Sequence, residues 1–68
     1  MSDEELEDAF IQGMTLRIYT SRIGHFVACR VVVLYWRAKP DAFIIEATER
    51  GHFHWIQRSD PSLIIKRA

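Results

Sequence analysis

The chemistry of the chain changes at Gly13. The residues before it have the composition of an acidic helix, whereas the residues after it follow the alternation of β-strands. Five acids and no base precede Ala9, and all nine lysines and arginines follow it together with only four further acids. The formal net charge of zero is therefore a −5 segment (five acids) added to a +5 segment (nine bases minus four acids). One helix with one β-domain is the architecture that this division predicts.

The size of the chain limits what it can bury. It has 68 residues, which make one domain, and 49% of them are hydrophobic. A domain this small buries only about 60% of its unfolded surface and is marginally stable alone. Because so small an interior cannot hide all of these side chains, the surplus predicts a homo-oligomer or a protein partner.

The cysteine and hydropathy patterns point to a cytoplasmic protein without a membrane segment. Cys29 is the only cysteine, so the chain has neither an internal disulfide nor a cysteine-based zinc site. A lone thiol and the lack of a signal pattern fit a reducing cytoplasm. The longest apolar run, residues 31–36, is far too short to span a bilayer.

The N-terminal segment carries helix signals at both ends. Ser2 and Glu5 have the spacing of a capping box, and Met1 and Leu6 have that of a hydrophobic staple. Gly13 is a typical C-terminal cap. A helix of about ten residues is not stable alone in water, so its narrow apolar stripe must pack on the β-domain.

The rest of the chain alternates with a period of two. Five strands are predicted, separated by turns, at residues 15–20, 25–37, 42–48, 52–58 and 63–66. The second exceeds the usual strand length of about 3–10 residues, so it must bend or serve two faces of a curled sheet. The predicted interior consists of apolar residues in phase on these strands: Leu16, Ile18, Val31, Val33, Phe43, Ile45, Phe53 and Trp55. The predicted fold is mainly β: a small five-stranded Sm/SH3-like barrel over residues 14–68, with the acidic helix at 1–13.

Four segments carry a resemblance to the Sm-like superfamily: GMTLRIY at 13–19, DAFIIEA at 41–47, HWIQR at 54–58 and LIIK at 63–66. The chain resembles Hfq, Rof and the WYL domains in the order of its elements. Ala42-Phe43-Ile44 replaces the Trp-Tyr-Leu signature of WYL domains, and Gln57-Arg58-Ser59 stands where Hfq has Tyr-Lys-His. The resemblance implies a regulatory binding protein and gives Arg58 alone a ligand-contacting role.

Arginine alternates with aromatic residues on the outward positions of the strands. Guanidinium groups bind phosphates and aromatic faces stack on bases, so this composition is typical of a surface for single-stranded nucleic acid. The alternative is a set of solvated arginines, with Trp55 in the core. The candidate nucleic-acid-binding residues are Arg17, Tyr19, Arg30, Arg37, Arg50, Arg58, Lys66 and Arg67.

No residue pattern indicates catalysis. The pair His52 and His54 would need a third ligand, such as His25 or Glu46, to hold a metal, and the pattern favours two exposed histidines. Cys29 lies inside an apolar run with no obvious proton acceptor beside it and is expected to act as a small buried hydrophobe. We therefore expect a protein that is not an enzyme, with no catalytic residue, metal or cofactor.

Two functions remain open. The first is a nucleic-acid-binding regulatory module, with RNA as the favoured strand. The second is a small protein-binding inhibitor or adaptor, of the type found in phages and mobile elements, which acts through its acidic helix or its strand edges. On the second hypothesis the helix acids Asp3, Glu4, Glu7 and Asp8 contact the partner. They are otherwise a solvated cap or a screen over the basic face.

Overall fold

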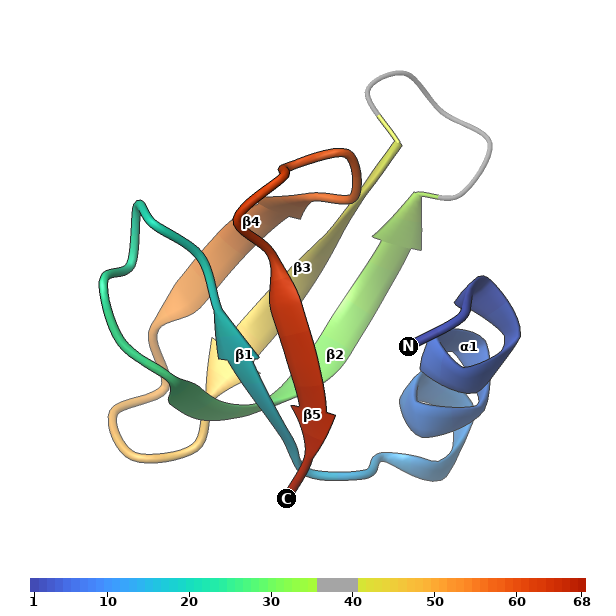
Figure 1. Cartoon of the computed structure of the whole chain (residues 1–68). Helices are drawn as coiled ribbons and strands as arrows, with labels where there is room; N and C mark the ends of the chain where they lie inside the picture. The colour runs from blue at the N-terminus through green and yellow to red at the C-terminus, as the bar shows by residue number, and fades with distance from the viewer. Residues whose placement is uncertain (36–40) are drawn as a thin grey trace.

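The structure, a computed structural model, describes residues 1–35 and 41–68, with only the backbone of Tyr35. One helix is followed by five strands (Figure 1): α1 Asp3–Gln12, β1 Leu16–Tyr19, β2 Val27–Tyr35, β3 Ala42–Ala47, β4 Phe53–Gln57 and β5 Ile64–Arg67. All ladders are antiparallel, and the strands lie in the order β4-β3-β2-β1-β5. The predicted mainly-β, barrel-like fold is confirmed. No helix in the described part of the chain is both long and apolar enough to cross a bilayer.

The predicted caps of α1 are present. The Glu5 amide donates to Ser2 Oγ at 3.1 Å, and the Ser2 amide donates to Glu5 Oε1 at 3.2 Å. Gly13 ends the helix in the left-handed region, with φ of 63°. Hydrogen bonds from Ser2, helped by Arg67, lower the pKa of the Glu5 carboxyl. The stabilisation from this carboxylate is therefore present at neutral pH and is lost as the pH falls through the lowered pKa.

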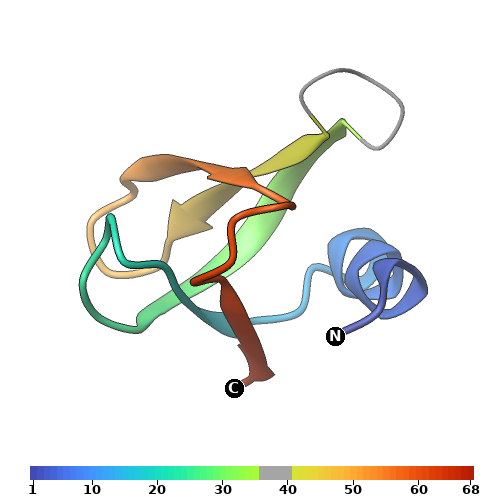
Figure 2. The ribbon, with the colours of Figure 1, turned by 45° about the horizontal axis from the view of Figure 1, so that its top comes forward.

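Strand β2 contains a bend, as its length predicted. Val31 pairs with Ile45, but Val33 pairs with Ile44, so Val32 is an extra residue in the ladder. A β-bulge of this kind bends the strand and increases its twist. The sheet therefore curves around its own interior (Figure 2). The predicted end of this strand at Arg37 and the turn that follows it lie outside the described residues.

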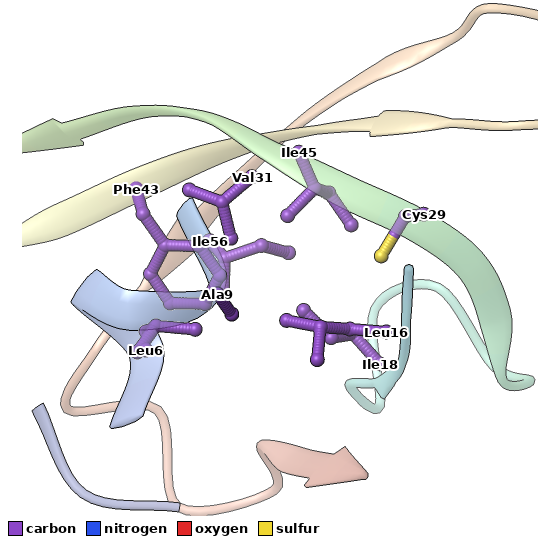
Figure 3. Packing of buried hydrophobic residues seen from close by; sticks show 9 residues of the cluster. All are labelled: Leu6, Ala9, Leu16, Ile18, Cys29, Val31, Phe43, Ile45 and Ile56. Atoms are coloured by element: carbon purple, nitrogen blue, oxygen red, sulfur yellow. The ribbon is translucent and has the colours of Figure 1, made fainter. Parts of the chain in front are cut away.

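The core lies between the curved sheet and α1 (Figure 3). Side chains from β1 face those of β2 and β3, and two residues of the helix complete the cluster. Leu6 is fully buried and Ala9 is 2% exposed, so the helix belongs to the core and does not merely cover it. The buried cluster is Leu6, Ala9, Leu16, Ile18, Cys29, Val31, Phe43, Ile45 and Ile56. Burial raises the pKa of the Cys29 thiol to about 11, in keeping with a small buried hydrophobe.

The predicted phase of β4 is wrong. Phe53 and Trp55 are 64% and 49% exposed, whereas Ile56 is 2% exposed and faces the core. The β3–β4 hairpin sets this register: it pairs Phe43 with Ile56, and these partners share one face of the sheet. One phase of β4 offers Phe53 and Trp55 and the other offers only Ile56 beside a histidine, so alternation alone favours the two rings. Val33, also predicted in the core, is only half-buried beside the bulge.

Replacing Leu6 tests whether the helix is part of the core. Leu6→Ala should lower the free energy of unfolding by about 2–5 kcal/mol, because it leaves a cavity among buried side chains. Ile11→Ala is the matched control: Ile11 lies on the same helix but is 77% exposed, so the expected cost is within about 0.5 kcal/mol. Urea unfolding followed by circular dichroism measures both. Equal costs for the two variants would show that α1 does not depend on this packing.

Candidate nucleic-acid interface

Four side chains meet on the outer face of β1 and β5, and we call them the Phe26 surface: Arg17, Tyr19, Phe26 and Lys66. Arg17 and Tyr19 point outward because Leu16 and Ile18, which alternate with them, are buried. Lys66 of β5 is the register partner of Arg17. The β1–β2 register pairs Ile18 with Val27, and one further step places Phe26 opposite Tyr19.

The aromatic rings of this surface lie in contact with its cations. The Arg17 Cζ atom lies 5.7 Å from the centroid of the Phe26 ring, and Lys66 Nζ lies 5.0 Å from it. The Tyr19 and Phe26 ring centroids are 5.6 Å apart at 45°. Within the described residues neither Arg17 nor Lys66 forms an ion pair with an acid. Two like charges therefore face each other across a ladder, an arrangement that costs stability.

Three other predicted arginines are bound to acids of the chain. Arg30 Nη2 lies 3.2 Å from Glu46 Oε1 on the neighbouring strand. Arg58 Nε donates to Asp3 Oδ1 at 2.9 Å, and its Nη2 donates to the Met1 carbonyl at 2.7 Å. Arg67 Nη2 reaches a helix acid, Glu5, at 3.5 Å. The Phe26 surface therefore does not include Arg30, Arg58 or Arg67.

The remaining predicted basic positions and the histidines lie elsewhere. Arg50 sits in the β3–β4 hairpin beside a pocket of about 720 Å³, which His25, His52 and His54 also line. Within residues 1–35 and 41–68, no three His, Cys, Asp or Glu side chains gather to hold a metal ion. Arg37 lies outside the described residues.

The helix acids divide into two groups. Asp3 and Glu5 face the arginines that bind them, whereas Glu4, Glu7 and Asp8 are exposed and form no ion pair within the described part of the chain. With Ile11, these last three occupy positions i, i+3, i+4 and i+7, which form one helix face. This face points away from Leu6 and Ala9, and thus away from the core.

Sequence reasoning missed Phe26 and the internal role of Arg58. The signal for Phe26 was present, because it has the same parity as the outward Ala28 and Arg30 on the second strand. Arg58 contacts Asp3 and Met1, which are 55 and 57 positions away in the chain, and no local pattern predicts such contacts. Comparison with known proteins finds no matching family model, curated protein or solved structure. Kinship with the Sm-like superfamily stays a prediction.

The two arginines that contact the helix should differ in effect. Arg58→Ala removes a short ion pair and a charge-assisted bond to a carbonyl, and should lower the free energy of unfolding by about 1–2 kcal/mol. Arg67→Ala removes one long, exposed contact and should cost less than about 0.5 kcal/mol. Hydrogen exchange of the α1 amides, measured beside urea unfolding, shows whether the helix is the part destabilised. If Arg67→Ala exposes α1 as much as Arg58→Ala does, Arg58 is not the main anchor.

Proposed function

We propose that the chain is a non-enzymatic regulatory module of the cytoplasm that binds single-stranded nucleic acid, RNA in the first instance, on the Phe26 surface. The observation that carries this proposal is the pair Arg17 and Lys66, held together over one aromatic ring with no acid partner among the described residues. A phosphate between the two cations relieves their repulsion. Tyr19, half-buried beside them, offers a ring for a base to stack on.

The charge of the surface can be tested without reversing its sign. Arg17→Gln with Lys66→Gln should reduce the affinity for a short single-stranded RNA and lower the salt slope by roughly 0.7 for each phosphate that the protein no longer neutralises. Gln57→Glu with Ser59→Glu changes the net charge equally on exposed positions away from Phe26, and should have little effect. Tyr19→Ala should weaken binding by about 1–3 kcal/mol if a base stacks there, whereas Tyr19→Phe should not. Fluorescence anisotropy at several salt concentrations measures all four variants.

A second function is favoured by the outer face of α1. Three acids surround an isoleucine that is 77% exposed, which suits a basic protein partner with an apolar centre. Glu4→Gln, Glu7→Gln and Asp8→Asn together leave the caps and the core intact. Tighter RNA binding by this variant identifies the acids as a screen over the basic surface. If nuclease-treated wild-type protein shows no salt-dependent affinity for any single strand, the inhibitor function replaces the first proposal.

We also propose that the chain assembles with copies of itself through its sheet edges. Strands β4 and β5 end the strand order, and neither has a second neighbour in the described part of the chain. Exposed apolar side chains lie on both: Phe53 and Trp55 on β4, and Ile64, 44% exposed, on β5. Pairing β4 of one copy with β5 of the next is a heterologous contact, which closes into a ring or continues as a filament.

Solution mass tests this assembly. Sedimentation of nuclease-treated protein at tens of micromolar should give a mass above that of one chain, because edge pairing buries the exposed apolar side chains of β4 and β5. Ile64→Lys places a charge on the β5 edge and should shift the mass toward the monomer. Ile11→Lys makes the same change at an exposed site on α1 and should not. A wild-type chain that stays monomeric at this concentration would exclude the proposed edge pairing.

A further inference from the structure

The open end of the barrel holds a pocket of about 720 Å³ that the Phe26 surface does not account for. Two segments line it: residues 20–28, which join β1 to β2 and include the start of β2, and residues 47–56 around the β3–β4 hairpin. They lie side by side in both ribbon views, at the end of the sheet away from α1 (Figures 1 and 2). The helix contributes nothing to its lining. The volume falls within the roughly 300–1,000 Å³ of pockets for small molecules.

Aromatic rings and positive groups converge on this pocket. Its ring-bearing walls are Phe26, Phe53 and Trp55, the last two of which are exposed where the β4 register turns them out of the core. Its charged and titratable lining consists of Arg22, His25, Glu49, Arg50, His52 and His54. Glu49 is the only acid in that set. All three histidines of the chain stand at this one end.

The loops that carry these groups are held by other contacts. Gly24 donates to the Thr20 carbonyl at 2.9 Å, and Ile23 donates to Thr20 Oγ1 at 3.2 Å. The Gly51 amide closes the hairpin on the Ala47 carbonyl at 3.0 Å. Neither Arg22 nor Arg50 forms an ion pair in the part of the chain that the structure describes. The two guanidinium groups are therefore not needed to shape the loops, and they are available to an anion.

We propose that this pocket binds a nucleotide: a planar base against the aromatic walls and a phosphate on Arg22 and Arg50. Guanidinium binds phosphate through paired, charge-assisted hydrogen bonds, and imidazole N–H groups add further donors. Aromatic rings stack on any base, so we expect the pocket to require both a base and a phosphate but not one particular base. The ligand is either a free mononucleotide or the terminal nucleotide of a bound strand.

Phe26 connects the pocket with the proposed strand-binding surface. Its ring carries the contacts to Arg17 and Lys66, and the same residue lines the pocket. A strand that lies on the Phe26 surface can therefore place its phosphorylated end in the pocket. This strand-end source rests on the proposed function, whereas binding of a free nucleotide does not.

The test is a titration of the ¹⁵N-labelled chain followed by NMR, with adenosine 5′-monophosphate, adenosine and inorganic phosphate as separate probes. The nucleotide should shift amides in residues 20–28 and 47–56 and bind at least about tenfold more tightly than adenosine, because only the nucleotide offers a charged group to the arginines. Arg50→Gln and Arg22→Gln should each weaken it by about tenfold. Gln57→Glu makes the same change in net charge at an exposed β4 residue outside the pocket lining, and it should change the nucleotide affinity little.

Two results overturn the pocket. One is an equal response to the nucleotide and to adenosine, and the other is binding that Arg50→Gln and Arg22→Gln both leave unchanged. The proposal for the pocket can be wrong while the proposal for the Phe26 surface is right, and the experiments distinguish these cases. If a 5′-hydroxyl RNA still binds and Arg17→Gln with Lys66→Gln still weakens it, the proposed function stands without the pocket.

The chemistry of the RNA 5′ end distinguishes the two ligand sources. An RNA with a 5′-phosphate that binds more tightly than the same RNA with a 5′-hydroxyl, in a manner abolished by Arg50→Gln, identifies the strand end as the ligand. Mononucleotide binding that leaves RNA affinity unchanged identifies the free nucleotide. Both results support the pocket.

Discussion

The packing of α1 against the sheet is the contact on which the rest of the molecule depends. A sheet this small has too little interior to close with its own side chains, and the helix adds Leu6 and Ala9 to the core. Arg58 fixes the N-terminus of the helix by bonds to Asp3 and to the Met1 carbonyl. The helix packs at one end of the sheet, and the loops that line the pocket lie at the other end (Figure 1).

The packing of α1 on the sheet also produces an uneven distribution of charge in a chain whose formal net charge is zero. Of nine basic residues, Arg30, Arg58 and Arg67 are bound to acids, and two, Arg37 and Lys39, lie outside the described residues. The remaining four line either the Phe26 surface or the open-end pocket: Arg17, Arg22, Arg50 and Lys66. Although the formal net charge is zero, the cations without an acid partner among the described residues therefore gather around Phe26 and the pocket that it lines. On the proposed function, this local cluster of cations binds the phosphates, and the near-neutral net charge limits nonspecific binding.

Local signals in the sequence were enough to predict the caps of α1, the alternation of β1 and the bend in β2. Each depends on residues close together in the chain: a box over Ser2 and Glu5, a period of two, and a strand too long to stay straight. The phase of β4 was not predictable in this way, because it is set by which residue Phe43 pairs with across the hairpin. In the candidate site, too, local patterns were predictable and long-range pairing was not. Arg17 and Tyr19 were found from alternation, but the pairing of Arg17 with Lys66 joins the first and last strands.

The two rings that β4 exposes take part in both the pocket proposal and the assembly proposal. Had Phe53 and Trp55 filled the core, the open end would lack two of its aromatic walls, and the β4 edge would carry less apolar surface. Exposing two large rings forgoes the roughly 1.5–3 kcal/mol that burial of each such side chain provides, in a domain with little stability to spare. Both rings line the same pocket as Arg50 and the three histidines, so apolar rings and a positive guanidinium group stand together there. That combination suits a ligand with a flat ring and a negative charge, or a second copy of the chain at the β4 edge. Because Phe53 and Trp55 take part in both proposals, ligand binding in the pocket and edge pairing at β4 are expected to influence one another.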